Sequence, residues 1–252
     1  MDQIIKAKTF GTLHNDLFFN KNVSISFDCL NVDTNADYNV LVQIEPPSII
    51  NIVEEIIKNK NHFDLILTWN ENILSKCENS KLFPFGSCWI NPEDRLIHYK
   101  NKNISIISSN KRKTTGHNLR HQLISDKLID MAVFGRGYNP IENKITALKD
   151  YMFSVIIENE DTKNWFTEKI IDCLITGTVP IYWGCENIGD YFDTRGFIIF
   201  NDVEEFKTKI NTFNETTYLN MLPYIKINYE KAKEYSDFWG RVELEIKKNL
   251  NL

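Results

Sequence analysis

The sequence lacks paired cysteines. Its five cysteines are scattered along 252 residues, are odd in number and form no C-x-x-C pair, whereas zinc sites and disulfide frameworks need paired, regularly spaced cysteines. We therefore expect reduced thiols in a cytoplasmic protein, with no zinc site. The cysteines are Cys29, Cys77, Cys88, Cys173 and Cys185.

Long apolar runs and an excess of positive charge are also missing. The start, MDQIIKAKTF, has no apolar region typical of a signal peptide. No stretch approaches the roughly 18 apolar residues of a membrane-spanning helix. The formal net charge is −5, which argues against a nucleic-acid-binding surface. We expect neither a membrane span nor a nucleic-acid partner.

The composition itself, 42% hydrophobic and 25% charged, is typical of a globular protein. The recurring pattern is a short apolar run, a polar break and then helical periodicity, which predicts an α/β fold with mainly parallel strands. Predicted strands cover residues 23–27, 38–44, 63–69, 82–85, 104–108, 130–134, 152–157, 179–183 and 197–200. Residues 48–60 have the spacing of an amphipathic helix.

The chain is long enough for two small domains. A polar stretch at residues 90–103, which contains Pro92, is the best candidate boundary. We predict an N-terminal acceptor-side domain at 1–100, a C-terminal donor domain at 101–235 and a C-terminal helix at 236–252. Residues 218–252 read as helical and amphipathic. Packing is favoured over a membrane-surface role because the run ends in mixed charge without a broad basic face.

Polar residues follow several predicted strands. In open α/β sheets, ligands bind outside the carboxyl ends of the strands, so these residues mark one candidate edge. Strand ends are polar in most proteins, and this pattern alone identifies no site. The residues are Glu45, Asn110, Lys111, Arg112, Arg136, Glu158, Asn159 and Asn187, with Arg120 on the helix that follows one strand.

The run WFTEKIIDCLI, at residues 165–175, gives a sharper signal. Thr167 is a good helix N-cap and Gly177 a good terminator, so Lys169 falls in the first turn, where the helix dipole disfavours a cation. Two interpretations stay open. Either an anion binds there, held by backbone N–H groups and the ammonium, or a carboxylate such as Glu168 neutralises Lys169 at the surface.

A family resemblance enters at this run. The sequence FSVIIENEDTKNWFTEKIIDCLITGTVPIYWGCENIGDYF, at residues 153–192, resembles the signature region of the family 10 α1,3-fucosyltransferases, which has F-E-N, T-E-K and G-x-[IV]-P-[IV]-Y-W-G elements. Ile157, Trp165 and Phe166 depart from it. Residues 108–110 with Arg120, the turn at 133–136 and the run at 44–47 resemble further family elements. The resemblance is specific over about residues 104–202 and essentially absent over the first 35.

The resemblance implies the GT-B fold, with two Rossmann-like domains facing each other across a cleft. It implies an inverting, metal-independent transfer of L-fucose from GDP-fucose to a hydroxyl of a glycan, often of N-acetylglucosamine or glucose. It points to a soluble member of bacterial or viral type, with no cofactor beyond the donor substrate. The sequence has no Asp-x-Asp, and we expect Asp202 to cap a helix rather than to bind a metal.

The resemblance also implies roles for individual residues. Lys169 and Arg120 would bind the diphosphate, where charge develops as GDP leaves. Glu168 would bind the ribose or sugar hydroxyls. The remaining donor-side residues would surround them: Asn110, Asn159, Trp165, Thr167, Tyr182 and Trp183. Other interpretations stay open, namely that Arg120 is a solvated helix residue, Asn159 a turn former, Trp165 a packed loop aromatic and Trp183 plain core.

Glu45 is the candidate general base. An inverting displacement needs a carboxylate within hydrogen-bond reach of the acceptor hydroxyl, and Glu45 ends a predicted strand and precedes two prolines, which hold it stiffly. The alternative is a strand-terminal surface glutamate. Glu158 is a second candidate on the donor side. At the level of function, the alternatives are the same fold with another nucleotide sugar, or a nucleotide-sugar-binding module without turnover.

Overall fold

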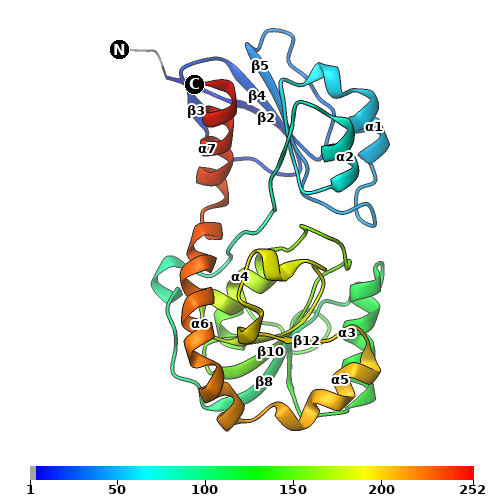
Figure 1. The fold of residues 1–252 in the computed structure, drawn as a ribbon, viewed down its shortest axis with the longest axis vertical. Helices are drawn as coiled ribbons and strands as arrows, with labels where there is room; N and C mark the ends of the chain where they lie inside the picture. The colour runs from blue at the N-terminus through cyan, green and yellow to red at the C-terminus, as the bar shows by residue number, and fades with distance from the viewer. Residues whose placement is uncertain (1–3) are drawn as a thin grey trace. The chain divides into compact units, whose positions relative to one another are not determined.

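A computed structural model describes residues 4–252 (Figure 1). Contacts within the chain divide it into two compact units, and each is discontinuous in sequence. Unit 1 contains the residues up to Phe85, the segment Lys163–Trp165 and the segment Asp237–Leu252; unit 2 contains Gly86–Thr162 and Phe166–Ser236. The chain therefore passes from one unit to the other four times. This division does not decide the acceptor and donor roles predicted for residues 1–100 and 101–235, which stay predictions.

Unit 1 is built on a parallel five-stranded sheet of order β2-β4-β5-β6-β7. Its strands are β2 (Lys8–Gly11), β4 (Val23–Phe27), β5 (Tyr38–Val42), β6 (Leu65–Thr68) and β7 (Ser80–Leu82). A separate antiparallel pair joins β1 (Ile5–Lys6) to β3 (Phe18–Phe19). The five parallel strands follow one another in chain order, so the sheet grows in one direction only.

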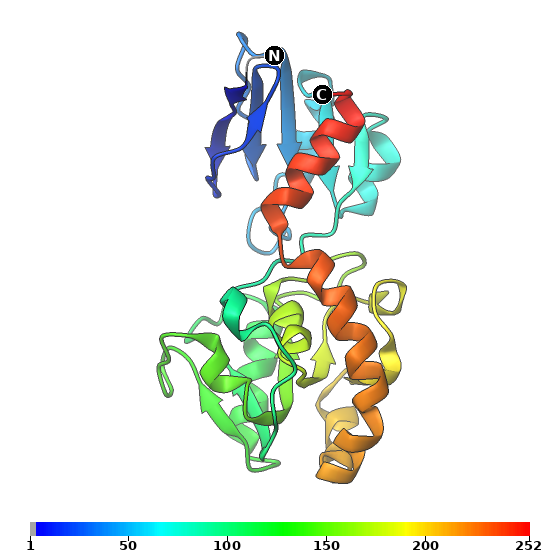
Figure 2. The same cartoon turned by 90° about the vertical axis from the view of Figure 1, so that its left-hand side faces the viewer.

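Helices cover both faces of this sheet (Figure 2). Leu41 packs with residues of α1 (Val53–Lys58) and α2 (Glu71–Lys76), whereas Val40 and Val42 pack with residues of α7 (Phe238–Leu250). Side chains alternate across a strand, so β5 supplies both cores. This explains why its three buried residues, at 40–42, are all apolar.

Unit 2 is a second parallel five-stranded sheet, of order β12-β11-β10-β8-β9. Its strands are β8 (Lys102–Ile107), β9 (Ala132–Phe134), β10 (Tyr151–Ile157), β11 (Val179–Trp183) and β12 (Ile198–Ile199). From β8 the chain first builds outward to β9 and then returns past β8 to begin β10. The doubly wound order therefore has a topological switch point between β8 and β10, a place where such folds bind ligands.

The helices of unit 2 also separate by face. Ile156 and Tyr182 pack with α4 (Glu168–Ile175), while the alternate residues of the same strands pack with residues of α3 (Thr115–Asp126) and α5 (Val203–Lys209). Helix α6 (Glu215–Tyr235) contributes to both clusters.

Short 3-10 turns occur in both units. They lie at Lys60–His62, Pro92–Asp94, Lys144–Ala147, Ile188–Asp190, Thr194–Gly196 and Ile210–Thr212.

The predicted bounds of α4 are confirmed. The Thr167 hydroxyl caps the helix by accepting the Lys169 N–H. Gly177 has φ +71°, and its N–H donates to the Leu174 carbonyl while the next N–H, of Thr178, donates to Cys173. Glycine adopts this left-handed conformation without the steric cost that a side chain carries, so the helix ends where the sequence indicates. The expected cap of α5 by Asp202 is confirmed as well.

Three predicted elements differ from the structure by more than two residues at one end. The helix predicted at 48–60 begins only at Val53, because the N–H groups of Ile49 and Ile50 form a turn on the Pro46 carbonyl. The strand predicted at 82–85 ends at Leu82, and Pro84 has no N–H for a sheet ladder. The helical segment predicted at 218–252 is two helices, α6 and α7, with Asp237 capping the second by accepting the Gly240 N–H.

Candidate active site

At the switch point of unit 2, the first turn of α3 contacts the residues that follow β10. The Gly116 N–H donates to the Asn159 carbonyl at 3.1 Å. A Cβ at Gly116 would lie only 1.7 Å from the Glu158 carbonyl oxygen. This close approach, which only glycine permits, brings the first turns of α3 to the residues that follow β10.

Glu158 connects this strand end to α4. Its side chain is fully buried, and its carboxylate accepts the Thr167 N–H at 2.9 Å, the Thr167 hydroxyl at 2.7 Å and the Lys169 ammonium at 3.3 Å. A buried charge requires such compensation. The sequence offered Glu158 as a second general base, but its carboxylate is instead engaged in fixing the first turn of α4.

Lys169 is held among oxygen atoms while remaining partly accessible. Besides Glu158, its ammonium lies 2.9 Å from the Thr167 hydroxyl and 3.7 Å from the nearer Glu168 carboxylate oxygen, and its side chain is 25% exposed. The carboxylate pairing that the sequence allowed is therefore present. Lys169 stands in the first turn of α4, where the helix dipole favours a negative charge.

Arg120 brings a second cation from α3 to Glu158. It is 5% exposed, and its Nη2 donates to the Asn159 side-chain oxygen at 2.8 Å and to the Glu158 carbonyl at 3.4 Å. Among the residues described, its Nε has no hydrogen-bond partner. Burial lowers the pKa of Arg120, and Glu158 and Glu168 act against that shift. A buried guanidinium with an unused donor is costly unless something accepts from it.

His117 lies close enough to these cations for their charges to affect its pKa. Burial, together with the charges of Arg120, Lys111 and Lys169, lowers the pKa of His117 to about 4. The ring is therefore neutral at pH 7, and its Nδ1 accepts the Thr114 N–H at 3.3 Å in a capping box at the start of α3. Burial is the larger cause of this shift, and the nearby cations add to it.

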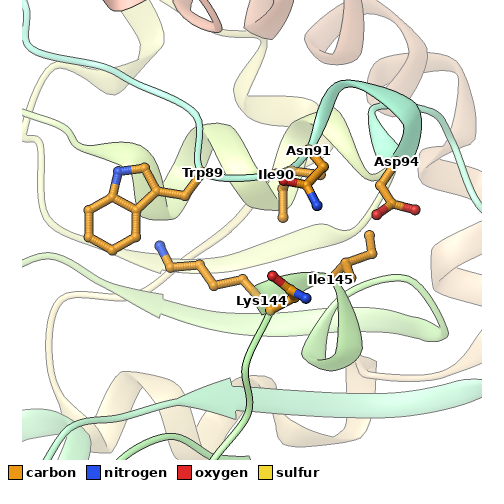
Figure 3. A pocket seen from close by; sticks show the side chains of 7 residues that line it. Trp89, Ile90, Asn91, Asp94, Lys144 and Ile145 are labelled. Carbon is orange, nitrogen blue, oxygen red and sulfur yellow. The ribbon is translucent and has the colours of Figure 1, made fainter. Parts of the chain in front are cut away.

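Glu168 is fixed on its other side by an ion cluster. The Lys144 ammonium lies 3.0 Å from Glu168 and 2.8 Å from Asp172, and 4.2 Å from the ring centre of Trp89 (Figure 3). Burial raises the pKa of Glu168, but Lys169 and Lys144 outweigh it and hold that pKa at about 2. Glu168 is thus an ionised acceptor in the first turn of α4. The hollow beside this cluster is lined by Trp89, Ile90, Asn91, Asp94, Asn143, Lys144 and Ile145.

The other predicted donor-side residues of unit 2 differ in accessibility. Asn110 is exposed in the segment between β8 and α3. Tyr182 is buried, and its hydroxyl accepts the Cys185 N–H at 3.0 Å. Trp183 is 5% exposed, and its indole N–H donates to the Asn201 carbonyl at 3.1 Å. Tyr182 and Trp183 therefore pack as core, and their predicted contact with a donor stays a prediction.

Glu45 lies in unit 1, three residues after the last residue of β5, and is half-buried. Its N–H and that of Ile44 donate to one Asp28 carboxylate oxygen, at 3.1 Å and 2.7 Å. Asp28 follows β4 and has φ +52°. Burial raises the pKa of Asp28, and the two backbone hydrogen bonds partly offset that shift.

Trp165 also lies in unit 1 and is only 1% exposed. Its indole N–H donates to the Ile44 carbonyl at 2.9 Å, and the Trp69 indole donates to the same oxygen at 3.0 Å. The two rings are 6.0 Å apart. This is the packed loop aromatic that the sequence allowed; stacking on a nucleotide would need a ring face that is not exposed here.

Two further observations concern classes of site. Over residues 4–252, no three His, Cys, Asp or Glu side chains are grouped as metal ligands would be. In the same part of the chain, no helix combines the length and apolarity needed to span a bilayer.

The two α/β units with parallel sheets define a GT-B fold, which solved glycosyltransferase structures share. An α1,3-fucosyltransferase solved with GDP-fucose matches with a TM-score of 0.56 and 19% identity, over 88% of this chain and 78% of that one. TarM matches with a TM-score of 0.54 and 14% identity, over 91% of this chain and 54% of that one. At these identities the likeness concerns the fold.

The model of the C-terminal region of glycosyltransferase family 10, the fucosyltransferases, matches residues 97–248, more than half of the chain. The chain therefore belongs to this family. The α-(1,3)-fucosyltransferase FucT of Helicobacter pylori is 33% identical over 104 residues, which are 39% of this chain and 22% of that protein. A putative fucosyltransferase-like protein of Arabidopsis thaliana is 39% identical over 49 residues, 19% of this chain and 10% of that protein. The matched regions thus span less than a quarter of each relative.

Sequence reasoning missed several residues that shape the site. Asp28 and Trp69 hold the backbone at Glu45, and Lys144 with Asp172 holds Glu168. Asp172 carried one usable signal, because it lies four residues after Glu168 and therefore on the same helix face. Asp28 and Trp69 carried none, since their partners are distant in sequence.

Proposed function

We propose that this chain transfers L-fucose from GDP-fucose to a hydroxyl of a glycan acceptor, with inversion and without a metal ion. The observation that carries the proposal is the pair of cations on Glu158. Arg120 is buried with an unused Nε donor, and Lys169 is partly exposed at a helix N-terminus. Such a pair fits a diphosphate, because it supplies directed donors and compensating charge.

The reaction we propose is a single displacement. Glu45 accepts the proton of the acceptor hydroxyl, whose oxygen forms a bond to C1 of fucose on the face opposite GDP. The bond from C1 to the phosphate oxygen breaks, and its electron pair stays on GDP. Lys169 and Arg120 offset the charge that develops there, which is the contribution usually supplied by preorganised electrostatics. In this proposal they take the part that a metal ion plays elsewhere.

Glu168 and Asn159 would complete the donor site. Glu168 is ionised and fixed by Lys144, so it can accept hydrogen bonds from hydroxyls of the ribose or the sugar. Asn159 orients Arg120 through its side-chain oxygen. We also propose a cytoplasmic location, because none of the five cysteines forms a disulfide, as is usual in reducing compartments.

Calorimetry without metal tests the donor assignment. We expect GDP-fucose to bind at micromolar Kd, and UDP-glucose, UDP-N-acetylglucosamine and GDP-mannose to bind at least about tenfold more weakly. Lys169→Ala should weaken binding by about tenfold or more through loss of a charge-assisted contact. Lys207→Ala, which removes an exposed lysine of α5 paired with Glu204, serves as the control and should bind as the wild type does.

Each outcome has one consequence. Binding of another nucleotide sugar in place of GDP-fucose keeps the site and overturns the donor. Tight binding without transfer to any N-acetylglucosamine- or glucose-terminated acceptor indicates a binding module. Equal binding by Lys169→Ala and the wild type removes Lys169 from the diphosphate site.

A further inference from the structure

We propose that Trp165 and Trp69 are positioning residues for Glu45, acting through the carbonyl of Ile44. The inference rests on the proposed function, in which Glu45 is the general base. It concerns a group of residues in unit 1 that we call the Ile44 cluster: Asp28, Ile44, Trp69 and Trp165. Its four members come from four separate places in the sequence.

The Ile44 cluster surrounds the peptide group that joins Ile44 to Glu45. The carbonyl of this peptide accepts both indole N–H groups, at 2.9 Å from Trp165 and 3.0 Å from Trp69. Its N–H, which belongs to Glu45, donates to Asp28 at 3.1 Å, and the same Asp28 oxygen accepts the preceding N–H at 2.7 Å. Both ends of one peptide group are therefore held by side chains from other parts of unit 1.

The Ile44 carbonyl accepts two hydrogen bonds from buried indoles, although one would satisfy it. Trp69 is 2% and Trp165 1% exposed, and each buried indole N–H needs an acceptor. A carbonyl oxygen has two lone pairs, and here both indole N–H groups are directed at the same oxygen. Each indole lies against the other at 6.0 Å, so a rotation of either ring would disturb its neighbour.

The residue after Glu45 limits the backbone from the other side. Pro46 is buried, and a proline confines the residue before it to extended conformations. The peptide before Glu45 is fixed by the Ile44 cluster and the backbone after it by Pro46. A catalytic group requires this precision, since a displacement of about 1 Å can reduce turnover by about a hundredfold.

Trp165 has a further property that a purely structural tryptophan need not have. It belongs to unit 1, yet it stands two residues before Thr167, the N-cap of α4 in unit 2. The residue before it, Asn164, is 7% exposed and has φ +60°. The chain thus adopts an uncommon conformation where it brings the Trp165 indole into unit 1.

The test is a double-mutant cycle on turnover, with GDP-fucose as donor and an N-acetylglucosamine- or glucose-terminated oligosaccharide as acceptor. Trp165→Phe removes the indole N–H and keeps an aromatic ring. We expect kcat to fall by about tenfold or more, while the KM and the calorimetric Kd for GDP-fucose stay within twofold. Trp69→Phe should behave in the same way. Trp239→Phe is the matched control, because Trp239 packs by ring contacts with Phe27 and Phe238 in the same unit.

The second arm of the cycle uses Glu45→Gln, which should lose most turnover and retain GDP-fucose binding. If Trp165 acts through Glu45, adding Trp165→Phe to Glu45→Gln should lower kcat no further. An equal additional loss in both backgrounds would indicate a structural role and overturn the proposal. A weaker Kd for GDP-fucose with unchanged kcat would instead make Trp165 a donor-binding residue.

The failure of this inference is distinguishable from failure of the proposed function. Normal turnover by Trp165→Phe and Trp69→Phe, alongside a loss in Glu45→Gln, overturns positioning and leaves the base in place. Unchanged turnover by Glu45→Gln overturns both the base and the positioning role. If Trp165→Phe melts well below Trp239→Phe, the Trp69→Phe cycle decides the matter by the same criteria.

Discussion

Lys100 is a buried lysine whose ammonium donates only to neutral oxygen atoms. Its Nζ lies 3.0 Å from the Leu148 carbonyl and 2.8 Å from both the Thr176 carbonyl and the Thr178 hydroxyl. Burial lowers its pKa to about 7, and the more distant charge of Asp150 only partly offsets that shift. The three oxygen atoms belong to segments that flank β10 and β11, so one side chain ties them together.

We predict that this lysine makes stability increase with pH. The pKa in the unfolded chain is about 10.4, so between pH 7 and pH 10 the unfolded state binds more protons than the folded state, and the free energy of unfolding rises with pH. From pH 7 to pH 9 the free energy of unfolding of the wild type should rise, relative to that of Lys100→Met, by up to about 2 kcal/mol. Urea unfolding at the two pH values measures it; a constant difference would contradict the lowered pKa.

At the scale of residues, the sequence predicted motif positions but not their partners. It placed Lys169 in the first turn of α4 and offered Glu168 as its counter-charge. Lys169 does stand in that turn, and it lies within ion-pair distance of Glu168. The closer partner, Glu158, stands eleven residues earlier and comes into contact only because β10 and α4 meet. Lys144 was not predicted at all, since its pairing with Asp172 spans 28 residues. Such pairings are tertiary, and no local pattern encodes them.

At the scale of elements, the contact between α3 and β10 depends on Gly116. Its backbone conformation is ordinary, so the requirement is space. An added Cβ would overlap the backbone of Glu158 and come within 3.1 Å of the Asn159 Cα. Backbone atoms cannot rotate away as a flexible side chain can, so α3 would have to move and carry Arg120 with it.

We therefore predict that Gly116→Ala destabilises the protein by about 1–3 kcal/mol and weakens nucleotide-sugar binding. The control is Gly189→Ala, whose added Cβ would meet Thr194 at an ordinary 3.4 Å and should change neither quantity. Chemical unfolding and GDP-fucose calorimetry measure the two effects. Unchanged binding in a destabilised Gly116→Ala would show that Arg120 keeps its place when α3 shifts, or that it has no part in binding.

The elements themselves were largely predictable where periodicity and turn chemistry agree. The strands at 23–27 and 179–183 have the predicted bounds. The first alternates apolar residues with serine and is followed by Asp28, and the second is an apolar run that ends at Gly184. The helix predicted at 48–60 failed at its start, where a turn on Pro46 competes with the helical pattern. Apolar spacing alone does not locate the first helical residue.

At the scale of the whole molecule, unit 1 depends on the last helix of the described chain. Phe238, Val242 and Ile246 of α7 are buried in the same cluster as β4 and β5. Removing residues 237–252 would expose the apolar face of that sheet. We predict that a chain ending at residue 236 loses the cooperative unfolding of unit 1 and binds a hydrophobic dye, while unit 2 still binds GDP-fucose. A separate peptide of residues 237–252 should reverse the dye binding; normal unfolding of the shortened chain would show that α7 is dispensable.

The sequence predicted a terminal amphipathic helix but not its destination. An apolar stripe shows that a helix packs on something, and it does not say on which sheet. The nearest domain along the chain is unit 2, which holds α6, yet after Ser236 the chain returns to unit 1. The unit that each segment joins depends on tertiary packing, and the residues that pack together are spread over the whole sequence.

The return of α7 to unit 1 has a consequence for how the protein is made. Phe27 and Phe238 lie with their ring centres 6.5 Å apart, although 211 residues separate them in sequence. A ribosome synthesises the chain from its N-terminus, so β2 to β7 emerge long before the helix that covers one of their faces. Contacts of such long range form slowly. One apolar face of the N-terminal sheet therefore stays uncovered until nearly all of this sequence has been translated.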